Sequence, residues 1–98
     1  MQVKFATVAE VELDEATIYC EKKVPGLGAQ FRDQVEHSAK QIGQMPLLYA
    51  EIRPSVRRYV LRRFPYSLVY SVEADYVFVI AVAHHKRRSQ YWVSRTPS

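Results

Sequence analysis

The sequence contains a single cysteine, Cys20. One cysteine excludes an intramolecular disulfide and a cysteine-based zinc site, and it suits a chain that works in a reducing compartment. Because free cysteines are usually buried, we expect Cys20 to be structural. The longest apolar run, residues 77–83, is too short to span a membrane. No signal-peptide pattern precedes the first strand-like segment, so we expect a cytoplasmic protein with no membrane partner.

The sequence also lacks the short motifs of common catalytic sites. Its three glycines do not form a phosphate-binding loop, and the zinc-protease motif HExxH is absent. The basic half of the chain has no paired carboxylates that would suit acid–base chemistry. We therefore expect neither a cofactor nor a metal.

Acidic residues are scarce in the C-terminal half of the chain. Residues 52–98 contain only Glu73 and Asp75 against nine lysines and arginines, whereas the whole chain has 10 acidic and 14 basic residues and a net charge of +4. A positive field of this kind attracts nucleic acid or an acidic protein partner. The length of 98 residues suits one compact domain, which we expect to span residues 1–98.

Periodicity in the first half predicts one strand and two helices. Alternation over residues 2–5 predicts the strand, and the capping-box pattern from Thr7 to Glu10 predicts the start of a helix that ends near Lys23. Apolar residues at spacings of three and four predict a second helix over residues 27–45, antiparallel to the first. Residues 46–54 have the pattern of a loop.

The second half has the period of two that is typical of strands. Alternation over residues 56–62 and 66–72 predicts a hairpin, and the apolar run over residues 76–84 predicts a buried central strand. The predicted order is β-α-α-β-β-β, an α+β fold in which an antiparallel sheet carries two antiparallel helices on one face. The expected core of the helices is Leu13, Ala16, Phe31, Val35 and Ile42.

Strand alternation divides the four arginines of the hairpin between the two faces of the sheet. Arg58 and Arg62 share the helix-free face with Ser67, and we expect this face to be the surface that binds a target or partner. Arg57 and Arg63 lie on the helix side. There they would reach water at the strand ends or pair with the acidic residues at positions 10, 12 and 15.

The segment that follows the last strand combines titratable, cationic and aromatic side chains. They are His84, His85, Arg87, Arg88, Tyr91 and Trp92. Histidines suit acid–base chemistry near neutral pH, arginines bind phosphates, and aromatic rings stack on bases. Each feature also has a structural explanation: histidines that bond backbone groups at a strand end, a solvated charge pair, and aromatic rings that hold the tail on the core.

Five segments, taken in order, resemble the RelE/ParE superfamily of toxins from bacterial toxin–antitoxin modules. They are ELDEA from residue 12, PGLGAQF from residue 25, VRR from residue 56, LRRFPYSLVY from residue 61 and VIAVAHHKRRSQYW from residue 79. The resemblance implies a growth-inhibiting toxin of a type II, plasmid-stabilising module. It also implies a cognate antitoxin that wraps a helical or extended segment over the toxin in a hetero-oligomer.

Two toxic activities occur in that superfamily. ParE-like members bind and poison DNA gyrase, whereas RelE-like members cut mRNA on the ribosome without a metal. The nucleases have an arginine in the middle of the second hairpin strand, where this sequence has Ser67. Loss of a cation aimed at the scissile phosphate typically lowers the rate by roughly 10² to 10³. The resemblance therefore favours the ParE-like branch, with target- or antitoxin-binding residues Arg58, Arg62, Ser67, Arg87, Arg88 and Trp92.

Two alternatives remain open. In the first, the chain is a RelE-like ribosome-dependent endoribonuclease, an mRNA interferase whose catalytic residues are His84, His85, Arg87 and Tyr91, assisted by Arg88. Tyr91 matches the position of a C-terminal catalytic tyrosine in some of these nucleases. In the second, the chain is a non-toxic basic domain that binds an antitoxin or nucleic acid.

Overall fold

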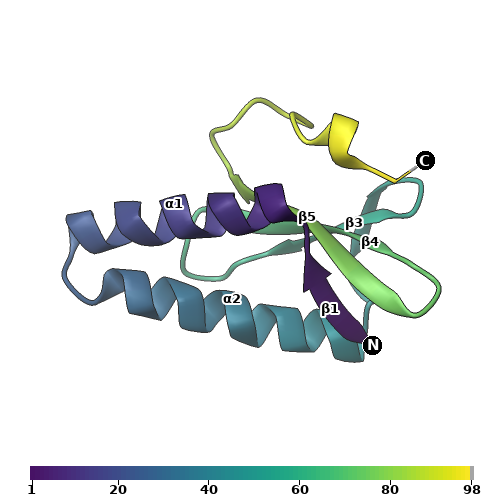
Figure 1. Cartoon of the computed structure of the whole chain (residues 1–98), viewed down its shortest axis with the longest axis horizontal. Coiled ribbons are helices and arrows are strands. Elements are labelled where there is room, and N and C mark those ends of the chain that lie inside the picture. The colour runs from purple at the N-terminus through teal and green to yellow at the C-terminus, as the bar shows by residue number, and fades with distance from the viewer. Residues whose placement is uncertain (98) are drawn as a thin grey trace.

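Two helices lie against one face of a sheet, and the C-terminal segment crosses the opposite face (Figure 1). A computed structural model describes residues 1–97; Ser98, part of the expected single domain, lies outside the described residues. The elements in chain order are β1 (Gln2–Phe5), α1 (Thr7–Lys23), α2 (Leu27–Gln44), β2 (Ala50–Arg53), β3 (Val56–Val60), β4 (Tyr66–Val72), β5 (Tyr76–His84) and the 3-10 helix η1 (Val93–Arg95). The predicted α+β class and the helices on one face are confirmed.

The sheet has the strand order β1-β5-β4-β3-β2. The pairs from β2 to β5 are antiparallel, but β1 pairs with β5 in parallel, with Val3 opposite Val77. The expectation of a wholly antiparallel sheet was therefore wrong at this edge. Alternation in a sequence indicates which side chains share a face, but it does not indicate the direction of the neighbouring strand.

The segment predicted as a loop, residues 46–54, contains the edge strand β2. Ala50 pairs with Arg58 and Glu51 with Arg57, and the register shifts between Glu51 and Arg53. The strand has four residues, and its burial does not alternate. A strand this short at a sheet edge has too little periodicity to be recognised from the sequence.

The first helix begins differently from its predicted capping box. Its N-cap is Ala6, which has no side chain able to cap the helix, and Thr7 is already helical. The Ala6 amide donates to the carbonyl of Val79 at 2.9 Å. The chain therefore passes directly from the sheet into α1, and the sheet, not a side chain of the helix, holds the N-terminal end. The predicted end at Lys23 is confirmed.

A carboxylate holds the tight link between the helices. Glu21 accepts hydrogen bonds from the Gly26 amide at 2.9 and 3.1 Å and from the Gly28 amide at 3.0 Å. Gly26 has a φ of +89°, a left-handed conformation that glycine adopts without steric cost. The Pro-Gly link therefore turns sharply, and the first amides of α2 find an acceptor on α1.

The main core lies between the helices and the sheet. It contains Ala9, Ala16, Cys20, Phe31, Val35, Ile42, Leu61, Phe64, Tyr66, Leu68, Tyr70, Val77, Val79 and Val82, with Leu13 packed against it. Four of the five predicted helix core residues are thus buried, and Leu13 is partly buried. Cys20 is buried as expected, and its burial raises the pKa of the thiol.

A second, smaller core lies on the opposite face of the sheet. Trp92 packs there against Val56, Val69, Ile80 and Ala81 and is 4% exposed. We expected this face to be available to a partner, but the C-terminal segment covers part of it (Figure 1), and Trp92 holds the tail on the core, which was the structural explanation for this ring. The open remainder lies beside the loop that leads from β5 to Trp92. Within residues 1–97, neither helix combines the length and apolar character that crossing a membrane requires.

Candidate functional site

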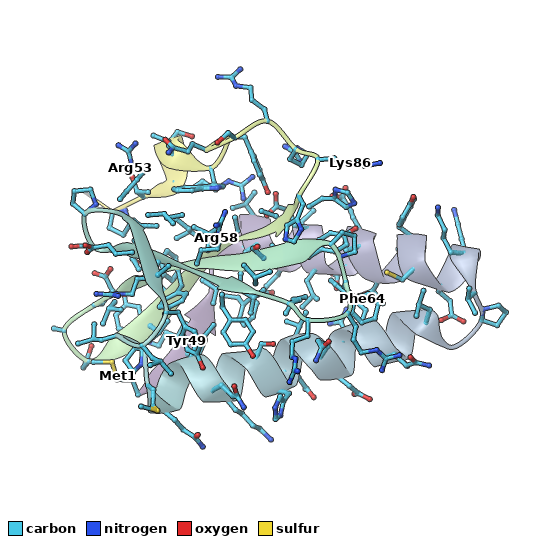
Figure 2. All side chains as sticks on the ribbon, turned by 180° about the vertical axis from the view of Figure 1, so that it is seen from behind. Met1, Tyr49, Arg53, Arg58, Phe64 and Lys86 are labelled. Atoms are coloured by element: carbon cyan, nitrogen blue, oxygen red, sulfur yellow. The ribbon has the colours of Figure 1, made fainter. Side chains whose placement is uncertain are left out.

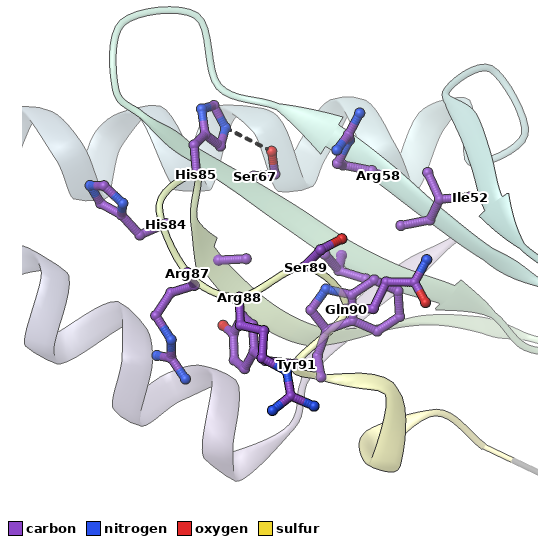
Figure 3. Close-up of a pocket in the computed structure, with 13 residues that line it drawn as sticks. Ile52, Arg58, Ser67, His84, His85, Arg87, Arg88, Ser89, Gln90 and Tyr91 are labelled. Atoms are coloured by element: carbon purple, nitrogen blue, oxygen red, sulfur yellow. Dashed lines mark hydrogen bonds between the residues drawn. The ribbon is translucent and has the colours of Figure 1, made fainter.

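A pocket of about 270 Å³ opens on the helix-free face, between the sheet and the loop that follows β5 (Figure 3). The sheet contributes Arg58, Ser67 and Ala83, and the loop contributes His85 and Arg88. Arg53 of β2 donates to the side chain of Gln90 at 3.1 Å. This bond ties the edge of the sheet to the loop, so that strand and loop residues form one wall.

Strand pairing places the polar residues of the pocket on one face, as alternation predicted. Ser67 lies opposite Val60 on β3 and Ala83 on β5, and Arg58 lies opposite Val69, two residues along β4. Arg58 and Ser67 are therefore diagonal neighbours on the same face. Figure 2 shows Arg58 on the side of the sheet that faces the C-terminal segment, and Tyr49 on the side that faces α2.

Ser67 and His85 form a hydrogen-bonded pair. The Ser67 hydroxyl oxygen and His85 Nε2 lie 3.0 Å apart, and the tautomer of the imidazole decides which atom donates. The backbone amide of His85 donates to the carbonyl of Pro65 at 2.8 Å, so the turn after β5 is fixed to the β3–β4 loop. Ser67 is 2% exposed and lies at the base of the pocket.

The neighbouring His84 points away from His85 (Figure 3). Its ring stacks edge-on against Tyr66, with centroids 4.9 Å apart, and its Nδ1 accepts from the amide of Lys86 at 2.9 Å. Burial lowers the pKa of His84, and the adjacent His85 and Lys86 lower it further. The two histidines therefore lie in different environments and do not form one acid–base pair.

A largely buried carboxylate anchors the C-terminal segment. Glu12 of α1 accepts from the Tyr91 hydroxyl at 2.6 Å, from Arg95 at 2.8 and 3.2 Å, and from the Val82 amide at 3.0 Å. Burial raises the pKa of Tyr91, and its hydrogen bond to Glu12 and the charge of Glu12 raise it further. Tyr91 is therefore protonated at neutral pH, and its hydroxyl already donates a hydrogen bond to Glu12.

The two loop arginines differ in how they are held. The guanidinium of Arg87 stacks over the Tyr91 ring, 3.9 Å from its centroid, and Arg95 lies 5.1 Å from the same ring. Arg87 thus packs against the anchored tyrosine, and the cation and the ring attract one another. Arg88 is exposed at the pocket wall.

The arginines of the hairpin are placed only partly as expected. Arg62 follows the end of β3 and is exposed, away from the residues that line the pocket. Arg57 lies on the helix side, but it donates to the carbonyls of Leu47 and Tyr49 at 3.2 and 2.7 Å. The expected pair between Arg57 or Arg63 and an acidic residue of the first helix does not form within residues 1–97, where the partner of Glu12 is Arg95.

Arg95 is the residue of this site that sequence reasoning missed. It lies in a short tail with no periodicity, 83 positions from Glu12 along the chain. The excess of arginine in the basic half gave no sign of which arginine pairs with which carboxylate. Among residues 1–97, no group of three or more histidine, cysteine or acidic side chains is arranged to hold a metal ion.

Comparison with known proteins identifies relatives of the chain. The model of a family described as the ParE toxin of the type II toxin–antitoxin system parDE matches residues 3–89. A search of curated proteins found no match. A solved structure described as the chromosomal ParDE TA system from P. aeruginosa is similar, with a TM-score of 0.76 and 19% identity, over 86% of this chain and 95% of that chain. These matches confirm the predicted superfamily and its ParE-like branch.

Proposed function

The chain belongs to the ParE toxin family of type II toxin–antitoxin systems, and on this premise we propose that it inhibits bacterial growth by poisoning DNA gyrase. A cognate antitoxin would neutralise it. The family match over residues 3–89 carries the proposal, because that match includes both helices, all of the sheet except Gln2, and the start of the basic loop.

The chemistry of the pocket supports a binding protein over a nuclease. RNA cleavage by the 2′-hydroxyl needs a general base, a general acid and cations at the scissile phosphate. The Tyr91 hydroxyl is protonated and donates its proton to a hydrogen bond with Glu12, and the Ser67 side chain carries no charge. His84 faces Tyr66, away from His85. The tyrosine is therefore engaged and the two histidines are separated, so the pocket has no paired general acid and base.

An apolar stripe on α1 supports the proposed antitoxin partner. Val8, Val11 and Ile18 are 38%, 49% and 56% exposed, and their spacings of three and seven place them along one side of the helix. The exposed Glu15 lies between Val11 and Ile18 on this side, so a partner segment with apolar and polar positions in the matching order would cover it. An amphipathic segment of the antitoxin would bury this stripe.

Induced expression of the chain alone in a bacterium tests the proposal. We expect growth arrest with a DNA-damage response. With purified gyrase we expect accumulation of cleaved DNA and loss of supercoiling, while primer extension finds intact transcripts. Intact supercoiling together with cut transcripts would overturn the gyrase proposal in favour of the ribosome-dependent nuclease. Normal growth with full expression would instead indicate a non-toxic binding domain.

The single variant Tyr91→Phe separates the two toxic activities further. A nuclease that uses the Tyr91 hydroxyl would lose its activity, whereas we expect the variant to keep gyrase inhibition within roughly tenfold. Circular dichroism and the thermal midpoint would verify that the variant is folded, since Tyr91 donates to Glu12.

A further inference from the structure

The pocket on the helix-free face is lined by cations and hydrogen-bond donors without any carboxylate. Arg58, Arg87 and Arg88 border it, and no aspartate or glutamate does. Within residues 1–97, the arginines that form ion pairs are Arg32 and Arg95, so the three pocket arginines are not neutralised by an internal partner. An uncompensated cluster of this kind attracts an anion.

The donors at the base of the pocket suit a phosphate group. Arg58 and Ser67 are diagonal neighbours on adjacent strands, and His85 bonds Ser67 at 3.0 Å. A histidine that donates to the Ser67 oxygen leaves the hydroxyl proton free to point at a bound anion. The guanidinium of Arg58 would supply two parallel N–H donors, the arrangement in which arginine binds phosphate oxygens.

The other wall of the pocket is apolar. Ile52 of the edge strand, Val69 of β4 and the edge of Trp92 border it. These residues belong to, or pack against, the second core, so the wall is held in place. A polar end beside an apolar wall, in a cavity of about 270 Å³, matches one phosphate with its adjoining nucleoside better than a free inorganic anion.

We propose that this pocket binds a backbone phosphate of DNA, with Arg58, Ser67 and His85 around the phosphate oxygens and the neighbouring nucleoside against Ile52 and Trp92. The choice of DNA over RNA rests on the proposed function, since gyrase holds its DNA while the toxin is bound. The chain would then contact both the enzyme and its substrate. Binding occurs without cleavage, because DNA has no 2′-hydroxyl to attack the phosphate and the Tyr91 hydroxyl remains on Glu12.

Fluorescence anisotropy of the purified chain with a labelled single-stranded DNA oligonucleotide, at several salt concentrations, tests this proposal. We expect Arg58→Gln to weaken binding about tenfold or more and to reduce the slope of log K against log salt by about one. Ser67→Ala, which removes one donor, should weaken binding about threefold to tenfold. Arg58 is exposed, so its substitution leaves the fold intact.

Arg63→Gln is the matched control, because it removes the same positive charge from the same hairpin. Arg63 is exposed and does not line this pocket. We expect it to change affinity by less than about twofold. Equal losses in the Arg58 and Arg63 variants would mean attraction by the general field, and no loss in either would mean that DNA binds elsewhere; both results overturn the proposal.

Competition experiments identify the ligand. Thymidine 3′,5′-bisphosphate should displace the oligonucleotide at a lower concentration than inorganic phosphate does, because only the former contacts the apolar wall. Equal displacement by inorganic phosphate, or tighter binding and cutting of an RNA oligonucleotide, would overturn the assignment to DNA. The assay contains neither gyrase nor antitoxin, so its failure is distinguishable from failure of the gyrase proposal.

Discussion

The hydroxyl of Tyr91 donates a 2.6 Å hydrogen bond to Glu12, 79 positions earlier in the chain. Glu12 is 10% exposed and also pairs with Arg95. A carboxylate near the start of α1 thus holds the segment that borders the basic pocket. The ring held in this way supports Arg87, so the position of a pocket arginine depends on a residue of the first helix.

Glu12→Gln should destabilise the protein by about 2–4 kcal/mol, because it removes a charge that is paired and largely buried. Arg95 would lose its ion pair, and the one amide oxygen of glutamine would have to replace two carboxylate oxygens that accept from Tyr91, Arg95 and the Val82 amide. Chemical denaturation measures the loss. The control Glu10→Gln removes an exposed carboxylate two residues earlier and should change stability by less than about 0.5 kcal/mol. Equal effects would mean that the anchor contributes nothing beyond surface charge.

Gly28→Ala should destabilise the helical hairpin, although alanine is intrinsically the better helix former. A Cβ at this position would lie 2.8 Å from the Thr17 carbonyl oxygen and 3.0 Å from a Glu21 carboxylate oxygen. The first contact is with the backbone of the other helix, so we expect a loss of about 1–3 kcal/mol. Denaturant unfolding measures it, with the exposed Gln30→Ala as control. A stabilised Gly28→Ala protein would show that the helices separate readily.

Ile18→Asp should weaken binding of the cognate antitoxin at least about tenfold without unfolding the toxin. Ile18 is 56% exposed in the apolar stripe of α1, and a carboxylate there would be desolvated by an apolar partner. Calorimetry with purified antitoxin measures the change. Leu48→Asp is the control, since Leu48 is 61% exposed in the loop between α2 and β2. Unchanged affinity for the Ile18 variant would place the antitoxin elsewhere.

Acid should destabilise the protein partly through His84. Burial holds the pKa of this histidine below its ordinary value of 6.5, so the unfolded chain binds the proton more readily. The stability that His84 contributes is therefore present above pH 6.5 and is lost as the pH falls through the lowered pKa. Thermal midpoints between pH 5 and 8 should fall less steeply for His84→Gln than for the wild type. His37→Gln, an exposed helix variant, should follow the wild type.

Local patterns predicted most elements and the division of the hairpin between two faces. Spacings of three and four identified α1 and α2, and alternation placed Arg58 with Ser67 and separated both from Arg57. These predictions succeeded because side-chain direction repeats within a helix or a strand. The capping box failed because the sheet, through Val79, supplies the partner for the start of α1.

The sequence by itself determined the kinds of element, the residues that face the core and the concentration of positive charge in the second half. Only the tertiary structure decided that β1 lies parallel to β5, that residues 50–53 pair at the edge, and that Glu12 receives Tyr91 and Arg95. The physical reason is the separation along the chain over which each feature is decided. Periodicity reports how one segment divides between core and solvent, whereas pairing between distant segments depends on how all of them pack together.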